Sequence, residues 1–333
     1  MKKFNKSILI TGGTGSFGNA LIEYLFKYYN LSKRVVIFSR DELKQFDMQK
    51  KFSPTKYPFL RYFIGDIRDK ERLMTAMEGI DLVIHAAALK QVPTAEYNPM
   101  EAIKTNIIGT QNVIDSSIYN SVEKSILLST DKASSPVNLY GATKLCADKL
   151  FISANKIVGS KKSSFSVVRY GNVMGSRGSV IPVFKEQSKK GILQLTNKKM
   201  TRFNITLKES VELVITAINE SVGGEIFVPK IPSYRLIDLA KAIDNKSKIV
   251  EKGIREGEKK HEELISQSDS AYTLDLKKYF IIMPFDKELQ NKIINKKKYK
   301  DKKIKIFSYN SRDNSDFLTV EKIKKILKNH NKI

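Results

Sequence analysis

The sequence predicts an α/β protein built around a doubly wound parallel sheet. In the first half of the chain, short apolar runs rich in β-branched residues alternate with stretches of helical periodicity, which is typical of βαβ units. A glycine-rich segment directly follows the first apolar run, as at the turn from a strand into a helix. From Gly175 onward the alternation weakens and strand candidates become sparse, which predicts a smaller C-terminal α/β region.

Seven short runs are apolar on both faces and are therefore expected to be strands covered by helices on each side. They are residues 7–10, 35–38, 62–64, 82–84, 126–128, 166–168 and 226–228. Helices are expected at 70–78, 99–120 and 138–157, and a first helix should begin in the glycine-rich segment and bury Leu21 and Leu25. We place a domain boundary after residue 172, so that residues 173–333 form the second region.

Composition excludes several classes of protein. The 333 residues are 41% hydrophobic and 28% charged, as in ordinary globular proteins, and no apolar run approaches the roughly 18 residues that a membrane span needs. A single cysteine, Cys146, excludes an internal disulfide framework and a cysteine-cluster metal site. We therefore expect a cytoplasmic protein with no membrane attachment and no bound metal.

The chain is strongly basic. Lys and Arg number 59 against 35 Asp and Glu, which gives a formal net charge of +24. Part of this excess lies in the lysine-rich run 292–305, which has little aromatic content and matches no nucleic-acid-binding motif. We expect this run to be a solvated loop and expect no nucleic-acid partner.

The glycine-rich segment 11–18 predicts a dinucleotide-binding site of Rossmann type. Gly12 permits the tight turn after the strand, Gly15 lets a pyrophosphate approach the backbone, and Gly18 lets the helix pack closely on the strand. The N-terminus of the helix then offers free N–H groups and a favourable dipole to the phosphates. The same loop contributes the candidate contacts Thr14, Ser16 and Phe17.

The residues after the second strand favour NADP over NAD. NAD sites usually place an acidic residue here, whereas NADP sites place an arginine for the 2′-phosphate. Arg40 can bind that phosphate with two hydrogen bonds, and Ser39 and Lys44 add a hydroxyl and a second positive charge. Asp41 and Glu42 are expected to cap the next helix. Further candidate cofactor contacts are Leu43, Asp66 beside the adenine, Ile67, Ala86, Lys90 and Val173.

Tyr140 and Lys144 are spaced i and i+4 on a predicted helix, which places both side chains on one face. A nearby ammonium and a nicotinamide cation favour the tyrosinate, so that Tyr140 can remove a hydroxyl proton as hydride departs. The pair is common by chance, but its position after the glycine loop and the predicted strands indicates an active site.

With these motifs the chain resembles the extended short-chain dehydrogenase/reductase superfamily, which uses this Tyr–Lys pair. Residues 129–132 narrow the resemblance, because 4,6-dehydratases that retain the sugar C5 configuration have Thr-Asp-Glu where this chain has Thr130, Asp131 and Lys132. With segments 40–44, 87–90, 96–99 and 169–173, the chain resembles the inverting UDP-N-acetylglucosamine 4,6-dehydratases of pseudaminic acid synthesis. Related membrane-anchored and capsule-type enzymes typically have Met in place of Tyr140, so the intact tyrosine favours the pseudaminic branch.

The resemblance implies a role for each catalytic candidate. Tyr140 removes the proton of the sugar O4, Lys144 tunes Tyr140 and holds the nicotinamide ribose, and Thr130 polarises the O4 position. Lys132 is the base that removes the C5 proton, provided that burial or the cofactor lowers its pKa, and Asp131 protonates the departing C6 hydroxyl. Hydride returns to C6 and a proton reaches C5 from the opposite face, so NADP ends unchanged.

The resemblance also implies that residues 1–172 bind NADP and that later residues mainly bind the UDP-sugar. The candidate substrate contacts are Lys90, Asn172, Arg177, Gly178, Ser179, Val180, Ile181, Phe184, Arg202, Arg255 and Glu258. Asn204 and Glu256 depart from the family pattern, which usually has Trp and Pro there, so sugar preference is open at these positions. A homo-oligomer, such as a hexamer, is implied as well.

Two other functions remain open. A UDP-sugar 4-epimerase needs Tyr140 and Lys144 but leaves Lys132 idle, so replacing Lys132 distinguishes it from a dehydratase. A non-catalytic NADP-binding regulatory protein has no need of both Tyr140 and Lys144, whose presence argues against it.

Overall fold

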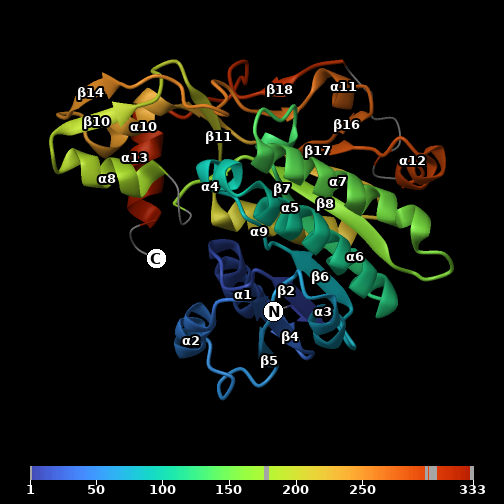
Figure 1. Ribbon diagram of the computed structural model, residues 1–333. Helices are drawn as coiled ribbons and strands as arrows, with labels where there is room; N and C mark the ends of the chain where they lie inside the picture. The colour runs from blue at the N-terminus through green and yellow to red at the C-terminus, as the bar shows by residue number, and fades with distance from the viewer. Residues whose placement is uncertain (1, 176–179, 297–298, 300–305, 331–333) are drawn as a thin grey trace.

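A sheet of nine strands runs through the computed structural model, which describes residues 2–175, 180–296, 299 and 306–330 (Figure 1). Seven neighbouring strands are parallel, and they are the seven that the sequence predicts. Their order is β12 (Ile226–Pro229), β8 (Ser164–Tyr170), β7 (Lys124–Thr130), β6 (Leu82–His85), β2 (Ile8–Thr11), β4 (Val35–Ser39) and β5 (Leu60–Ile64). The predicted fold class is therefore confirmed.

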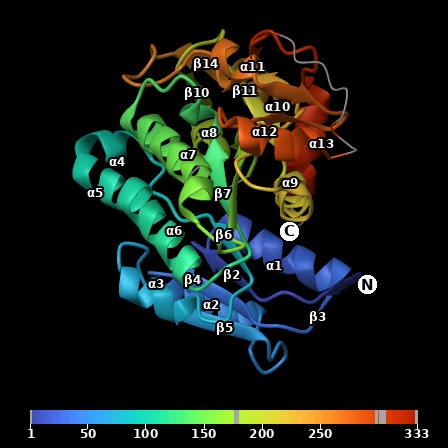
Figure 2. The same cartoon turned by 90° about the vertical axis from the view of Figure 1, so that its right-hand side faces the viewer.

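Helices pack on both faces of this sheet (Figure 2). On one face lie α3 (Lys70–Ala76), α6 (Gly109–Tyr119) and α7 (Leu139–Ile157), and on the other lie α1 (Ser16–Tyr28) and α9 (Leu207–Glu220). The strand order reverses between β2 and β6, so the loops after these two strands diverge. Such a reversal leaves a crevice at the carboxyl ends of the strands, where α/β proteins bind their ligands.

The helix predicted over 99–120 is one helical stretch with a wider turn inside it. It consists of α5 (Pro99–Ile103), a π-helical turn (Lys104–Ile108) and α6, and the short α4 (Val92–Tyr97) precedes it. Within the wider turn, the buried Asn106 hydrogen-bonds to the backbone N–H and carbonyl of Leu89 and to Thr143 Oγ1 on α7. The side chain thus joins this helix to the loop after β6 and to α7.

The expectation of few strands after Gly175 was wrong. β17 (Tyr279–Ile282) and β16 (Thr273–Asp275) extend the central sheet in antiparallel fashion, so the sheet continues past residue 172. These two strands follow each other with no helix between them, so they lack the alternation of strand and helix by which the parallel strands were predicted. Smaller sheets pair β10 (Ile192–Leu195) with β14 (Lys248–Glu251), β11 (Thr201–Ile205) with β13 (Ser233–Arg235) and β9 (Asn172–Val173), β15 (Glu263–Ile265) with β18 (Tyr309–Asn310), and β1 (Lys2–Phe4) with β3 (Tyr29–Leu31).

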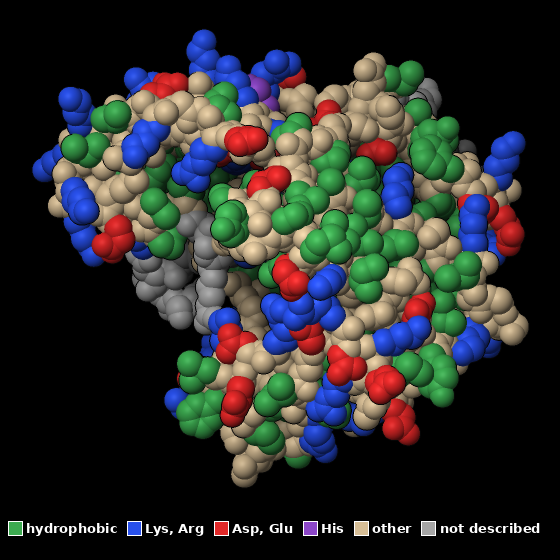
Figure 3. Space-filling model, in the orientation of Figure 1, with side chains coloured by type: hydrophobic (Ala, Val, Ile, Leu, Met, Phe, Trp, Pro, Cys, Tyr) green, Lys and Arg blue, Asp and Glu red, His purple; other side chains and the backbone are tan. Residues whose placement is uncertain are grey.

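A second, smaller apolar core lies beside the sheet, as predicted for the C-terminal region. Phe184, Leu193, Leu239 and Ile323 are buried together in it. It is built from β10 and from α8 (Val180–Ser188), α10 (Leu236–Ile243) and α13 (Val320–His330). Figure 3 shows the molecule deeply indented between this lobe and the part that carries α1 and α2 (Glu42–Lys51).

The lysine-rich run begins in a helix and not in a loop. Residues 292–294 end α12 (Lys287–Ile294), which follows the short α11 (Gln267–Ser270), while residues 297–298 and 300–305 lie outside the described part of the chain. Among the described residues, no helix is both long and apolar enough to cross a membrane.

Candidate active site

The loop after β2 forms a backbone cradle at the start of α1. Gly12 has a φ of 64°, and a Cβ atom there would lie 2.9 Å from the backbone of Ala87. A Cβ atom on Gly18 would collide with the backbone of Gly13, so α1 packs directly on the loop. Gly15 is the N-cap residue of α1, and no side chain within the described residues caps this helix. The exposed amides at this cavity wall fit a pyrophosphate group.

The residues predicted at the adenosine end lie together at the ends of β4 and β5. Arg40 Nη1 lies 3.6 Å from Asp66 Oδ2, and Arg68 Nη2 binds the same oxygen at 2.7 Å. Burial raises the pKa of Asp66, but hydrogen bonds and charge from Arg68 outweigh burial and hold the pKa below its usual value. Asp41 caps α2, as expected, by accepting a hydrogen bond from the backbone N–H of Lys44.

The crevice is a cavity of about 1310 Å3 that brings most predicted site residues together. All five catalytic candidates line it: Thr130, Asp131, Lys132, Tyr140 and Lys144. The cofactor candidates on its wall are Gly12, Thr14, Gly15, Ser16, Phe17, Ser39, Arg40, Asp41, Lys44, Asp66, Ile67, Ala86, Lys90 and Val173. The substrate candidates on its wall, besides Lys90, are Asn172, Val180, Ile181, Phe184, Arg202, Arg255 and Glu258.

Three predicted contacts that the structure describes are not on this wall, and three others fall on residues that it does not describe. Gly18 lies behind the loop because it serves helix packing, as its predicted role requires. Glu42 and Leu43 stand in the first turn of α2, and the Leu43 side chain is 68% exposed away from the cavity. Glu42 and Leu43 as cofactor contacts stay a prediction, which their absence from the cavity wall does not support. Arg177, Gly178 and Ser179 lie outside the described residues.

Tyr140 and Lys144 occupy the first turns of α7, whose N-cap is Asn138. Burial raises the pKa of Tyr140 to about 12, although the charge of Lys132 and a hydrogen bond with Thr130 partly oppose it. Burial lowers the pKa of Lys144 to about 8, and its Nζ donates to the carbonyl of Leu128 at 2.9 Å. In the protein without cofactor, Tyr140 is therefore a neutral phenol at neutral pH, and the tyrosinate stays a prediction.

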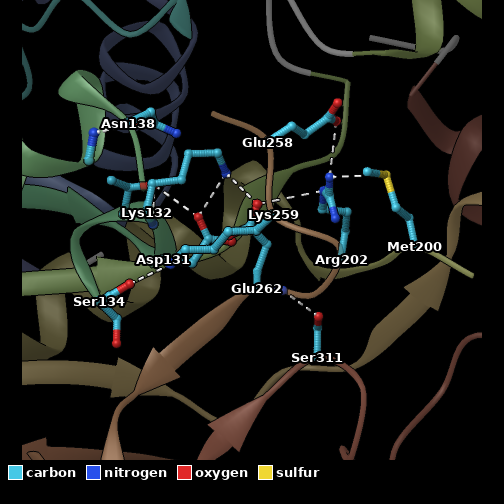
Figure 4. Close-up of polar contacts among 12 residues, drawn as sticks. Asp131, Lys132, Ser134, Asn138, Met200, Arg202, Glu258, Lys259, Glu262 and Ser311 are labelled. Atoms are coloured by element: carbon cyan, nitrogen blue, oxygen red, sulfur yellow. Dashed lines mark hydrogen bonds and ion pairs between the residues drawn. The ribbon is translucent and has the colours of Figure 1, made fainter. Parts of the chain in front are cut away.

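Lys132 bridges two buried carboxylates (Figure 4). Its Nζ lies 3.0 Å from Asp131 Oδ1 and 3.3 Å from Glu262 Oε1. Burial lowers the pKa of Lys132, but the two carboxylates raise it by more, so the pKa lies above its usual value. Burial alone therefore does not meet the condition set for Lys132 as a base, because Asp131 and the unpredicted Glu262 outweigh it. Burial and Glu262 raise the pKa of Asp131, which favours the protonated acid.

Arg202 extends the same network from β11. Its Nη2 lies 3.1 Å from Glu258 Oε1, and its Nε lies 3.7 Å from Glu262 Oε1. Arg255, the other predicted diphosphate partner, is exposed at the mouth of the cavity. Asn204 is buried and does not line the cavity, although it shares β11 with Arg202 and pairs in register with Asn172, two predicted substrate contacts. Glu256, the other departure from the family pattern, lines the cavity.

Buried polar atoms around the cavity match a ligand rich in polar groups. Six of them have no hydrogen-bond partner within the described part of the chain. They are Thr105 Oγ1, Ser129 Oγ, Asp131 Oδ2, Asn172 Oδ1, Glu258 Oε2 and Glu262 Oε2. Buried polar atoms in native proteins are normally paired, so these atoms and the glycine cradle fit a bound nucleotide and sugar.

The sequence analysis missed two residues of the cluster, Glu262 and Lys259. Lys259 donates from Nζ to the carbonyl of Ser134, and Asn138 donates from Nδ2 to the carbonyl of Gly257 at 2.7 Å. These contacts join the segment before β15 to the loop between β7 and α7. The many charged residues in 255–263 are the one feature of the sequence that draws attention to Glu262 and Lys259. This feature does not indicate which loop the segment contacts.

A phosphate-binding glycine loop and a buried Tyr–Lys pair on a doubly wound sheet define an enzyme of the short-chain dehydrogenase/reductase class. The chain belongs to the family described as polysaccharide biosynthesis protein, which it matches over residues 8–284. This result and the relatives below confirm the resemblance inferred from the motifs.

Close relatives span the whole chain. An inverting UDP-N-acetylglucosamine 4,6-dehydratase of Campylobacter jejuni is 53% identical and covers 96% of both chains. A protein of Rickettsia akari named UDP-glucose 4-epimerase is 44% identical and covers 97% of this chain and 95% of its own. The crystal structure of Pen from Bacillus thuringiensis has a TM-score of 0.86 at 40% identity and covers 97% of this chain and 98% of its own.

The fold is shared with more distant nucleotide-sugar enzymes. DesIV from Streptomyces venezuelae, a dTDP-glucose 4,6-dehydratase solved with NAD bound, has a TM-score of 0.65 at 19% identity. It covers 76% of this chain and 86% of its own, which supports the assignment of the fold.

Proposed function

We propose that the protein is an NADP-dependent UDP-N-acetylglucosamine 4,6-dehydratase that inverts the configuration at C5. The observation that carries the proposal is the meeting of Asp131 and Lys132 with Tyr140 and Lys144 in one cavity. The product is UDP-2-acetamido-2,6-dideoxy-β-L-arabino-hex-4-ulose, formed with loss of one water. The similarity to the Campylobacter dehydratase supports this substrate.

The glycine cradle and the ends of β4 and β5 would hold NADP. Arg40 stands beside Asp66 and would bind the 2′-phosphate, with Ser39 adjacent. When bound, NADP supplies an acceptor for the C4 hydride and returns this hydride to C6. The buried Lys144 would bind the nicotinamide ribose, since its ammonium is held at the cavity wall by the Leu128 carbonyl.

Tyr140 begins the reaction by removing the proton of the sugar O4. Its neighbours Lys132 and Thr130 already favour the tyrosinate, and the charge of the bound cofactor adds to their effect. Thr130 caps the turn that carries Asp131 and Lys132, and its hydroxyl would polarise the O4 position. Oxidation at C4 makes the C5 hydrogen acidic, which prepares the elimination.

Asp131 and Lys132 carry out the elimination. Lys132 accepts the C5 proton, and Asp131 donates a proton to the departing C6 hydroxyl, which leaves as water. Transfer of one proton from Lys132 Nζ to Asp131 Oδ1, 3.0 Å away, would prepare both groups, because it leaves a neutral amine as the base and a protonated carboxyl as the donor. The raised pKa of Asp131 favours this acid form. A proton then reaches C5 from the opposite face, and this step inverts the configuration.

The UDP group would lie along the C-terminal lobe. Arg202 and Arg255 would bind the diphosphate and Glu258 a ribose hydroxyl, and Asn172, Ile181 and Phe184 line the same cavity. Arg202 is held by Glu258 in this structure, so diphosphate binding exchanges one anionic partner for another.

The test is mass spectrometry and proton NMR of UDP-N-acetylglucosamine incubated with the protein in D2O, without added cofactor. We expect loss of one water and gain of one deuterium, with the NMR couplings of an inverted C5. A retained C5 configuration contradicts the inverting mechanism, and an unchanged sugar contradicts this substrate.

A 4-epimerase is the second candidate because of the similarity to the Rickettsia protein of that name. Epimerisation needs Tyr140 and Lys144 but no base at C5. The variant Lys132→Ala decides between the two: it abolishes a dehydratase and spares an epimerase. An unchanged sugar mass with a new C4 epimer in the wild-type reaction would favour the epimerase.

The proposal extends to the setting of the enzyme. We infer a cytoplasmic enzyme for the first step of pseudaminic acid synthesis, acting as a homo-oligomer. Hydrophobic side chains gather over α5, α6 and α7 in Figure 3, and Met100, Ile108 and Tyr119 are exposed there. Sedimentation analysis tests the oligomer, and the variant Ile108→Asp should weaken it if this surface is buried between subunits.

A further inference from the structure

Glu262 is a buried carboxylate for which the proposed steps have no role. It lies directly before β15, and its Oε1 is 3.3 Å from Lys132 Nζ and 3.7 Å from Arg202 Nε (Figure 4). Its backbone N–H donates to Ser311 Oγ at 2.9 Å, which fixes the residue in the loop. The side chain is 3% exposed, so water screens its interactions only weakly.

We propose that Glu262 is a positioning residue that holds Lys132 in the active site and sets how protons are shared between Lys132 and Asp131. The inference rests on the proposed dehydratase function and adds a residue to it. Glu262 acts through Lys132, and its effect is on the proton state of the two groups that perform the elimination.

Two carboxylates share the Lys132 ammonium, with Asp131 Oδ1 at 3.0 Å and Glu262 Oε1 at 3.3 Å. Two buried acids this close to one cation repel each other, so one of them holds its proton more tightly than the other. Glu262 is the favoured anion because Arg202 also faces it, whereas Asp131 lies deeper and receives no second cation at ion-pair distance within the described residues. Asp131 is thereby left as the proton donor.

The groups that face Glu262 come from four parts of the chain. They are Asp131 and Lys132 on the turn after β7, Arg202 on β11, Tyr234 on β13 and Lys259 on the segment that carries Glu262 itself. Burial raises the pKa of Glu262, but Lys132, Arg202 and Lys259 outweigh burial and hold it below its usual value. Glu262 is therefore ionised at neutral pH and acts on its neighbours as a fixed negative charge.

Replacing Glu262 by Gln removes this charge and keeps the shape of the side chain. Every neighbouring group then binds protons less tightly, so the pKa of Lys132 and the pKa of Asp131 both fall. Lys132 must be deprotonated to accept the C5 proton, so the rising limb of the pH–rate profile moves to lower pH. Asp131 must be protonated to donate, so the falling limb moves in the same direction.

The first experiment is the pH profile of UDP-N-acetylglucosamine dehydration by the full-length variant Glu262→Gln. We expect both limbs to move to lower pH by about one unit, with KM within about twofold of wild type. Glu262→Asp should restore the wild-type profile in part. The matched control is Glu263→Gln, which removes a neighbouring charge that binds Ser135 and Ser308 and should leave the profile in place. A loss of kcat without displacement of the profile would overturn the inference.

The second experiment requires no turnover. NMR of side-chain labelled lysine, assigned with Lys132→Arg, follows the titration of Lys132 in wild type and in Glu262→Gln. We expect the midpoint of Lys132 to fall by about one unit or more in the variant. An unchanged midpoint overturns the inference even if the dehydratase function holds. A lowered midpoint supports the coupling even if wild type fails to dehydrate the sugar, which would contradict the proposed function alone.

Discussion

The two halves of the cavity are built by different means. At the cofactor end, the contacts come from consecutive residues, because Gly12, Gly15 and Gly18 follow a buried strand and open a helix. At the elimination end, Lys132 meets Glu262 and Asp131, and Glu262 meets Arg202, from segments far apart in the chain. Local backbone geometry therefore forms the first half, and long-range charge pairing forms the second.

The two halves of the cavity therefore tolerate different kinds of substitution. A backbone cradle depends on the absence of side chains, so added atoms damage it, while changes of charge at a distance leave it intact. A buried charge cluster depends on balance, so removal of one charge changes the proton affinity of all its neighbours. Four predictions test this contrast, and their expected effects run from largest to smallest.

The largest effect is expected from Tyr140→Phe. Loss of the phenol removes the acid–base group at O4, so kcat for dehydration should fall by about 10²–10⁴-fold. NADP affinity, measured by calorimetry, should stay within about twofold because the cradle contacts are elsewhere. Retention of more than a tenth of wild-type kcat would show that another group deprotonates O4.

The second prediction concerns the buried charge of Lys144 and how it makes the stability of the protein depend on pH. Its folded-state pKa is about 8 and its ordinary value is 10.5, so between these values the unfolded chain binds more protons than the folded one. Stability of the cofactor-free protein should therefore rise with pH across this window, by about 2–3 kcal/mol relative to Lys144→Met. Urea unfolding at several pH values measures the difference, and a constant difference between the two proteins would contradict the lowered pKa.

The cradle should break when a methyl group is added at Gly18. The new Cβ would collide with the backbone of Gly13, so Gly18→Ala should lower the free energy of unfolding by about 1–3 kcal/mol and weaken NADP binding. Gly159→Ala is the control for a methyl group added away from the cradle, because the new Cβ would have no atom within 4 Å, although Gly159, unlike the helical Gly18, has a positive φ of 60°. The control should leave NADP affinity unchanged. Equal losses of affinity in both variants would refute a specific role for the cradle.

The smallest effect is expected from Arg40→Ala. Loss of one charged hydrogen-bonding partner of the 2′-phosphate should weaken NADP binding about tenfold and leave NAD binding unchanged. Arg61→Ala provides the comparison, since Arg61 binds the carbonyls of Pro58 and Leu60 and does not line the cavity. An equal loss of affinity for both cofactors would assign Arg40 to the shared part of the dinucleotide.

Most of the sheet and the cofactor half were predictable because their signals are local. Each of the seven parallel strands is a short run that is apolar on both faces, and each catalytic candidate stands in a motif beside one of them. The antiparallel strands β16 and β17 were missed because only residues 276–278 separate them, so they lack the alternation of strand and helix that marks the parallel strands. Glu42 and Leu43 were placed at the cofactor because their motif is adjacent, although the first turn of α2 directs Leu43 outward.

The sequence by itself determined the class of sheet, the glycine cradle and the spacing of Tyr140 and Lys144, because strand patterns, turn chemistry and helical periodicity all act within a few residues. Only the tertiary structure decided the proton state of Lys132. The Lys132 pKa depends on Glu262, which reaches it across the cavity from the segment before β15. Coulombic interactions in a buried site depend on the distance between the charges in space, which cannot be read from their separation along the chain.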